Sequence, residues 1–291
     1  MPVPWLDLSA NYLSAQDEFD EAIRRVLRSG NVSMGPDVYA LEDEFAVFCG
    51  RRRAISLGSG SAAILLTLRA LGIGPGDEVI TAPTSCPSVP TAITHSGARL
   101  VFADIQDGSA NIDPAQVEAR ITPLTRAVVA VHANGVPCDM AALAELARQR
   151  GLLLVEDGSV ATGARFAGRR VGAFGDAAVF SLGHGKVLSS YGNAAGMMTT
   201  DSEEVATAVR TLATYGAQPL PPEHDIPADF GPLDHACGVL GYNSHVGSLQ
   251  AAVLRIQLRR LDAALERRRA IAARYRAGLQ GLPVRTLEIP R

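Results

Sequence analysis

The sequence predicts an α/β fold with a mostly parallel sheet, and three observations support this prediction. Strand-like apolar runs alternate with helical patterns from about residue 54 to residue 200. Each run begins or ends near glycine, proline or aspartate, which favour turns. The chain of 291 residues is 47% hydrophobic, which is enough for the core of one large domain and part of another.

The first expected strand covers residues 53–57, and the glycines that follow it predict a tight turn. Residues 62–71 have helical spacing, because Ile64, Leu68 and Leu71 fall on one face. Further strands are expected at residues 78–82, 100–104, 126–131, 152–155 and 177–182, and further helices at residues 113–121 and 140–150. Apolar strands with helices between them are typical of a doubly wound sheet.

Two later segments have a different composition. Residues 218–233 are polar and rich in proline, which predicts a long surface loop. Residues 248–279 are dense in Ala, Leu and Arg at amphipathic spacing, which predicts a long helix. We expect this helix to link a large domain, residues 1–240, to the start of a small C-terminal domain that is incomplete within residues 241–291.

Charge and composition argue against some classes of binding partner. Charged residues make up 20% of the chain and the formal net charge is −3, so nothing favours nucleic acid or an anionic membrane surface. The first residues lack the basic and apolar parts of a signal peptide, and no apolar run reaches the length of a membrane span, so a cytoplasmic location is expected. The four cysteines are too widely spaced to indicate a disulfide framework or a metal site.

The turn Gly58-Ser59-Gly60-Ser61 is the first candidate binding feature. Its glycines let a ligand approach the backbone, and the start of the following helix offers donors to a phosphate. A simple strand-to-helix turn and a dinucleotide-binding turn fit the same residues. The dinucleotide interpretation is weakened, because the next strand ends without an acidic residue and Asp77 lies at its beginning.

Asp157 and Lys186 are the second and third candidates. Asp157 follows an apolar strand, where a carboxylate can keep a pyridine nitrogen protonated; an aspartate that caps the next turn is the alternative. Lys186 is the only lysine of the chain and lies in a glycine-rich loop after the strand at 177–182. A desolvated lysine suits amine chemistry, and a surface lysine in a loop is the alternative.

These residues resemble the DegT/StrS family of sugar aminotransferases that depend on pyridoxal 5'-phosphate (PLP), from the N-terminus to about residue 281. Matching segments occur in the family's order at residues 4–8, 30–36, 72–80, 135–140, 168–176, 241–244 and 249–252. The resemblance implies a fold-type-I PLP enzyme, usually a homodimer with active sites at the subunit interface. It also implies amino transfer from glutamate or glutamine to a nucleotide-linked keto-sugar or a keto-cyclitol.

Site residues carry over position by position. Lys186 matches the lysine that forms the Schiff base with PLP, and Asp157 matches the partner of the pyridinium nitrogen. The resemblance implies that six further residues bind the cofactor: Gly60, Ser61, Cys86, Val160, Ser181 and Asn243. Gly60, Ser61 and Ser181 match groups that contact the phosphate, and Asn243 matches an asparagine lent to the phosphate of the neighbouring subunit.

Several positions depart from the family pattern. Cys86 stands where an aromatic residue commonly stacks on the cofactor ring, and Val160 where a glutamine usually touches the phenolic oxygen. Residues 193–195 read Asn-Ala-Ala in place of an acidic residue and two glycines, and His245 replaces an expected arginine. These departures bear on substrate identity more than on cofactor binding.

The sequence is therefore compatible with three hypotheses for the function. An active aminotransferase would use Lys186 as the group that moves the substrate proton, in a ping-pong reaction. A PLP-binding partner subunit without turnover is the alternative, suggested by Val160, by residues 193–195 and by the end of the chain, where relatives continue into a small domain. The chain is either a fragment or a form that has lost that domain. A nicotinamide oxidoreductase is the weakest possibility.

Overall fold

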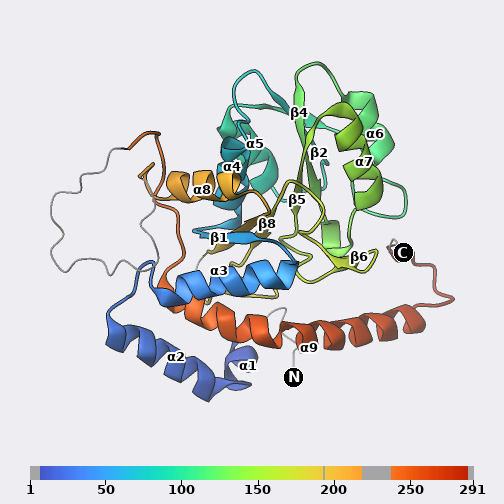
Figure 1. Ribbon diagram of the computed structural model, residues 1–291. Coiled ribbons are helices and arrows are strands. Elements are labelled where there is room, and N and C mark those ends of the chain that lie inside the picture. Colours follow the sequence, from blue (N-terminus) through green and yellow to red (C-terminus); the bar gives the residue numbers. More distant parts are fainter. Residues whose placement is uncertain (1–6, 193, 218–236, 288–291) are drawn as a thin grey trace.

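The computed structural model describes residues 7–192, 194–217 and 237–287. A seven-stranded sheet forms its centre, in the order β1-β9-β8-β5-β4-β2-β3 (Figure 1). The strands are β1 Arg53–Leu57, β2 Glu78–Thr81, β3 Arg99–Phe102, β4 Thr125–Val131, β5 Leu153–Asp157, β8 Ala177–Ser181 and β9 Gly196–Thr200. A separate ribbon pairs β6 Arg165–Phe166 with β7 Arg169–Arg170.

The sheet is mostly parallel, as the sequence predicts. Neighbouring strands from β3 to β8 run parallel, whereas β9 is antiparallel to both β8 and β1. Because β9 reverses direction between them, β1 and β8 point the same way. The carboxyl ends of all strands except β9 therefore lie at one edge of the sheet.

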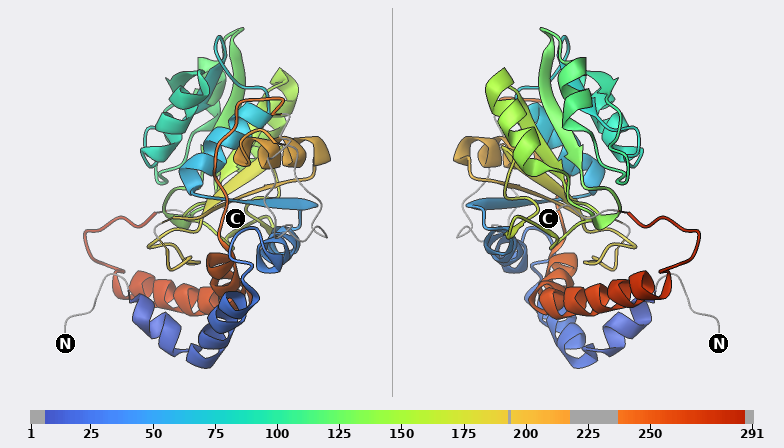
Figure 2. Two further views of the ribbon diagram at one scale, coloured as in Figure 1. Left: turned by 90° about the vertical axis from the view of Figure 1, so that its left-hand side faces the viewer. Right: turned by 90° about the vertical axis from the view of Figure 1, so that its right-hand side faces the viewer.

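Helices cover both faces of the sheet (Figures 1 and 2). They are α1 Leu8–Leu13, α2 Gln16–Ser29, α3 Pro36–Cys49, α4 Gly60–Ala70, α5 Ser88–Ser96, α6 Pro114–Arg120, α7 Met140–Arg150, α8 Glu203–Ala213 and α9 Ser248–Gly278, with a short 3-10 turn at Ala133–Gly135. Helices α4, α5 and α8 pack on one face. On the other face, α6 and α7 pack beside β2, β4 and β5, and α3 and α9 pack beside β8 and β9.

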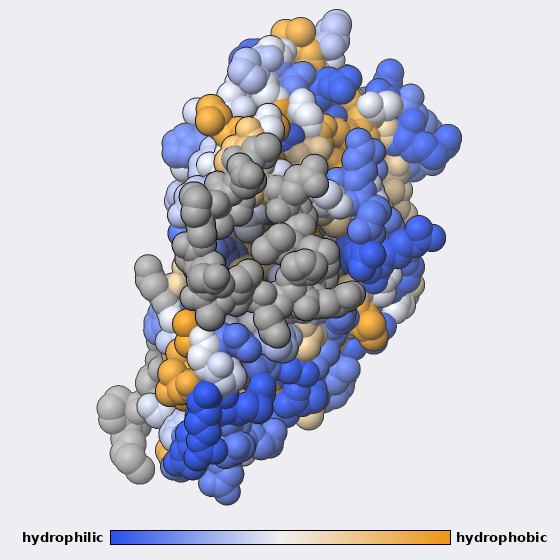
Figure 3. Space-filling model, turned by 60° about the vertical axis from the view of Figure 1, so that its left-hand side comes forward, coloured by the Kyte–Doolittle hydropathy of each residue, from blue (hydrophilic) through white to orange (hydrophobic). Residues whose placement is uncertain are grey.

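Strand β8 shows how the sequence builds these layers. Ala177 and Val179 enter the core beneath α4, whereas Ala178 and Phe180 enter the core beneath α3 and α9. Successive side chains of a strand point to opposite faces, so a strand that is buried on both faces is apolar throughout. On the face shown in Figure 3, the coloured residues are mainly hydrophilic and the hydrophobic ones form small separate areas.

The predicted boundaries hold for the strand at 53–57 and the helix at 140–150 and differ elsewhere by a few residues. The prediction for residues 152–155 is wrong at its end, because β5 continues through Asp157 in register with Val131 of β4. Strand β9 was not among the predicted strands. The proline-rich segment 218–233 and Asn193 lie outside the described residues.

Helix α9 packs against α2 and α3 along its first half. Ala252, Val253 and Ile256 share a buried cluster with Phe19 and Val26 of α2 (Figure 2). Further along, Ile271 and Tyr275 are exposed. The long helix predicted at residues 248–279 is thus confirmed as α9, and the domain division near residue 240 stays a prediction.

An ion-pair network ties α2, α3 and α9 together. Both Arg25, at 2.7 Å, and Arg255, at 2.6 Å, bind the carboxylate of Asp37, and Arg255 also binds Glu44 at 2.7 Å. Although burial opposes ionisation of Asp37, the hydrogen bonds from Arg25 and Arg255 keep the pKa of its carboxyl below the ordinary value.

Across the described part of the chain, no helix is both long enough and apolar enough to cross a membrane.

Candidate active site

The start of α4 forms the first wall of the candidate site. Ser59 caps this helix, because its Oγ accepts a hydrogen bond from Ala62 N at 3.0 Å and its carbonyl accepts one from Ala63 N at 2.9 Å. Within the described residues, the N–H groups of Gly60 and Ser61 donate to no protein acceptor. Such N–H groups at a helix start are suited to bind an anion.

Ser181, at the end of β8, lies directly against this turn. A Cβ atom placed on Gly60 would come within 2.9 Å of the Ser181 Cβ. The segment that contains Asn243 also reaches this end of the sheet, because Ser244 Oγ accepts a hydrogen bond from Gly58 N at 3.3 Å. Glycine at position 60 therefore permits the close approach of α4 and β8, and no larger residue fits without displacement.

Asp157 is buried at the end of β5, with 3% of its surface exposed. Its Oδ1 accepts a hydrogen bond from Ser159 N at 2.9 Å, and its backbone carbonyl accepts one from His132 N at 3.1 Å. The alternative role considered for this residue, an aspartate that caps the next turn, is therefore present. It does not exclude binding a cofactor, because the turn uses only one of the two carboxylate oxygens.

Lys186, Asp157 and Cys86 come from three different elements, and the charges of the first two act on the thiol of the third. Hydrogen bonds from Ser88 are the main cause that lowers the pKa of the Cys86 thiol; the positive charge of Lys186 lowers it further and the negative charge of Asp157 opposes the change. Lys186 is half-buried, and its backbone N–H donates to the Gly183 carbonyl at 3.2 Å. Strands β2, β5 and β8 thus lead into a thiol, a carboxylate and an amine at the carboxyl edge of the sheet.

The remaining predicted residues lie further out. Val160 is 51% exposed in the turn after β5, beside Gly135 of the 3-10 turn. Asn243 is exposed and is held through its backbone, which bridges to Thr214. Within the described residues, no hydrogen bond joins its side chain to another predicted site residue. His245 Nε2 lies 3.2 Å from Ser33 Oγ.

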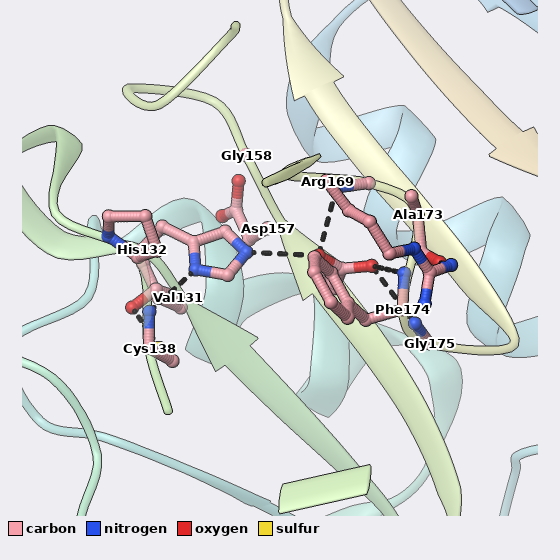
Figure 4. A network of polar contacts seen from close by, with 12 residues as sticks. Val131, His132, Cys138, Asp157, Gly158, Arg169, Ala173, Phe174 and Gly175 are labelled. Atoms are coloured by element: carbon pink, nitrogen blue, oxygen red, sulfur yellow. Dashed lines mark hydrogen bonds and ion pairs between the residues drawn. The ribbon is translucent and has the colours of Figure 1, made fainter. Parts of the chain in front are cut away.

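A buried network behind Asp157 escaped the sequence analysis (Figure 4). The fully buried carboxylate of Glu156 accepts hydrogen bonds from three backbone N–H groups, those of Gly172 at 2.8 Å, Phe174 at 2.7 Å and Gly175 at 2.9 Å. His132 Nε2 lies 3.3 Å from Glu156 Oε2. The sequence contained one indication of this network. Glu156 and Asp157 are adjacent in a strand, so the Glu156 side chain must point to the face of the sheet opposite to that of Asp157.

The tautomer of His132 follows from its second partner. Cys138 N donates to His132 Nδ1 at 3.0 Å, so Nδ1 carries no proton and Nε2–H donates to Glu156. Burial favours the neutral form of Glu156, but the hydrogen bonds from His132 and from the backbone outweigh it and hold the pKa of Glu156 below its ordinary value of 4.5. This network fixes β5, and with it the position of Asp157.

Because the pKa of Glu156 is lower in the folded state, its stabilising effect is complete above about pH 4.5 and is lost as the pH falls through the folded value. We expect Glu156→Gln to lower the free energy of unfolding by about 3 kcal/mol at pH 7. The glutamine NH2 group would point at backbone N–H groups whose hydrogen bonds the carboxylate oxygens of Glu156 accept. Urea unfolding at pH 7 and pH 4 measures this. Glu145→Gln, which changes an exposed partner of Arg148, should shift stability by less than about 0.5 kcal/mol. Equal effects in both variants would contradict the role assigned to the network.

The groups at this edge fit PLP. The phosphate of PLP is an anion, and the free N–H groups of α4 with the hydroxyls of Ser61 and Ser181 can donate to it. Asp157 offers a buried carboxylate for a protonated ring nitrogen, and Lys186 offers an amine for the aldehyde carbon. The tight approach of Gly60 to Ser181 supports this fit, because it brings the donors of two elements to one place.

Comparison with known proteins points to the same chemistry. The DegT/DnrJ/EryC1/StrS aminotransferase family model matches residues 14–290. The chain is 42% identical over 281 residues to dTDP-3-amino-3,4,6-trideoxy-alpha-D-glucose transaminase of Streptomyces venezuelae, covering 97% of this chain and 70% of that protein. It is 40% identical to EryC1 of Saccharopolyspora erythraea, named an erythromycin biosynthesis sensory transduction protein, covering 99% of this chain and 74% of that protein.

Solved structures agree with these relatives. The crystal structure of S. venezuelae DesV superposes with a TM-score of 0.88 at 42% identity, covering 97% of this chain and 72% of that chain. The PLP form of a putative sugar aminotransferase from Streptococcus pneumoniae superposes with a TM-score of 0.82 at 25% identity, covering 91% of this chain and 69% of that chain.

Proposed function

Because this chain belongs to the DegT/DnrJ/EryC1/StrS aminotransferase family and is a PLP-dependent aminotransferase, we propose that it transfers an amino group from glutamate or glutamine to a nucleotide-linked keto-sugar. Relatives named for transamination of dTDP-linked and UDP-linked sugars support this substrate class. A keto-cyclitol is a related acceptor. The observation that carries the proposal is that the turn at Gly60, the buried Asp157 and the loop of Lys186 follow strands β1, β5 and β8, whose carboxyl ends lie at one edge of the sheet, with Gly60 packed against Ser181.

Each residue has a distinct task in this proposal. When bound, PLP supplies an electron sink for the bond that is broken at the substrate carbon. Asp157 keeps the ring nitrogen protonated through its negative charge, and Ser61 and Ser181 donate to the phosphate. Lys186 Nζ would hold the cofactor through its aldehyde carbon and would move a proton at the substrate carbon.

The departure at Cys86 is compatible with this arrangement. The exposed thiol of Cys86 would offer a polarizable surface to the ring of a bound PLP, and the charge of Lys186 acts on this thiol. Val160 cannot donate a hydrogen bond to the phenolic oxygen, because its side chain is apolar. We therefore expect Val160 to change the surroundings of the PLP ring without preventing PLP from binding.

A half-reaction with the amino donor tests the proposed function. The PLP-loaded protein is mixed with glutamate or with glutamine, and the absorbance spectrum and mass spectrometry follow the conversion of PLP to pyridoxamine phosphate. We expect conversion with at least one of these donors and return to PLP on adding a dTDP-linked keto-sugar. Failure to convert with any amino donor would favour the PLP-binding partner subunit instead.

A homodimer with a shared site is the second part of the proposal. The exposed Asn243 side chain would donate to the phosphate bound by the neighbouring subunit, so dimerisation and PLP retention would be coupled. We expect Asn243→Ala to weaken PLP binding about tenfold and to shift the dimer toward monomer at low concentration. Sedimentation with and without PLP measures both effects. A monomer that retains PLP tightly would contradict the shared site.

A further inference from the structure

We propose that two glutamines of α9, Gln257 and Gln250, position the loop that carries Lys186. This inference rests on the proposed function, because it concerns the amine that acts there. Neither glutamine touches the reacting groups in our assignment. They act through the backbone of the segment that follows Lys186, and they are therefore positioning residues.

Gln257 binds the backbone of Ser189 with both atoms of its amide. Its Nε2 donates to the Ser189 carbonyl at 2.7 Å, and its Oε1 accepts from Ser189 N at 3.0 Å. The same Nε2 donates to Val253 O at 3.1 Å, which fixes the amide relative to α9. Gln257 is 6% exposed and Ser189 is 1% exposed, so water cannot replace these bonds at low cost.

The bond to Ser189 holds one end of a closed loop. Ser190 N donates to the Leu182 carbonyl at 2.9 Å, which joins the two ends of residues 182–190. Leu182 continues from β8, and Leu188 is buried in the cluster shared with α9. Lys186 lies between these two anchors, so its amine is positioned by β8 on one side and by Gln257 on the other.

Gln250 secures the chain just beyond this loop. Its Nε2 donates to Ala194 O at 2.9 Å, and its Oε1 accepts from Gly247 N at 3.2 Å. A Cβ atom at Gly192 would lie 2.5 Å from Gln250 Nε2, so the amide packs tightly against the backbone. Tyr191, whose φ of 56° is unusual for a residue with a side chain, is held by a hydrogen bond from its hydroxyl to Leu8 O at 2.9 Å.

Gln257→Glu is the sharpest variant, because it nearly keeps the shape of the side chain, removes the donor to Ser189 O and Val253 O and places a carboxylate against these two carbonyl oxygens. Gln149→Glu is the matched control, since it makes the same change on the exposed surface of α7. We expect Gln257→Glu to lower kcat by about 100-fold with KM for the sugar nearly unchanged, as for a misplaced reacting group. The control should match the wild type.

A second readout needs no sugar substrate. The absorbance of lysine-linked PLP changes with pH, and we expect the midpoint of this change to move by about one pH unit in Gln257→Glu, because displacement of the loop changes the surroundings of the linked amine. The same midpoint and the same kcat in the variant and the wild type would overturn the proposal. If Gln257→Glu does not fold, as judged by circular dichroism, Gln250→Glu decides the question with the same two measurements.

The two proposals fail differently. Wild-type protein that never links PLP covalently would refute the proposed function. Wild-type protein that links PLP and transfers the amino group, together with an unaltered pH midpoint and kcat in the glutamine variants, would refute only the positioning role.

Discussion

Replacing Lys186 with alanine should reduce amino transfer by on the order of 10⁴-fold, because the variant loses both the covalent attachment of PLP and the group that moves the substrate proton. PLP should still bind through the donors of Gly60, Ser61 and Ser181, since these lie on α4 and β8 and do not depend on the lysine. Turnover of the PLP-loaded variant and its PLP affinity, measured by absorbance titration, check the two halves of this expectation.

Lys186→Arg is the matched control for charge. Arginine keeps the positive charge near Cys86 but cannot lose its proton, so it cannot act as a nucleophile. It should be as inactive as the alanine variant. Borohydride reduction of the wild-type protein gives an independent check, because the chain has a single lysine and a label must map to residue 186. A label elsewhere, or substantial turnover by Lys186→Arg, would contradict the assignment.

Local patterns were sufficient to predict the framework of this site. Parallel strands place their carboxyl ends at one edge, so the order of strands and helices along the chain already predicts that the turn at Gly60, the carboxylate of Asp157 and the loop of Lys186 lie near one another. The apolar character of β8 on both faces indicates a buried central strand. The family resemblance then gave these residues their expected roles.

What escaped prediction depends on contacts between distant parts of the chain. Gln257 and Ser189 are separated by 68 residues, and nothing in an amphipathic helix marks which of its polar residues pairs with a loop backbone. Glu156 gains its partners from the turn after β7, which lies beside β5 only because of how the sheet is assembled. Strand β9 is likewise defined by pairing with β1 and β8 more than by its own composition.

Asp157→Asn isolates the charge of the carboxylate from its structural role. Asparagine can still accept the hydrogen bond from Ser159 N at its Oδ1, so the turn after β5 should persist. Asp157→Ala loses both the turn bond and the charge. Urea unfolding should therefore show near wild-type stability for the asparagine variant and a loss of about 1 kcal/mol for the alanine variant.

Although Asp157→Asn should hardly change stability, it should lower kcat strongly. Without a negative charge at residue 157, the ring nitrogen of PLP has no partner that keeps it protonated, and the electron sink is weakened. We expect Asp157→Asn to raise the barrier by roughly 4 kcal/mol, a loss of about 10³-fold in kcat, with PLP affinity nearly unchanged because the phosphate donors remain. Asp139→Asn makes the same substitution at the cap of α7, where Asp139 Oδ1 accepts from Ala142 N, and it should leave kcat unaltered. Stopped-flow measurement of the donor half-reaction separates these outcomes: near-normal rates in Asp157→Asn would assign Asp157 to the turn alone, since only its charge distinguishes the two side chains.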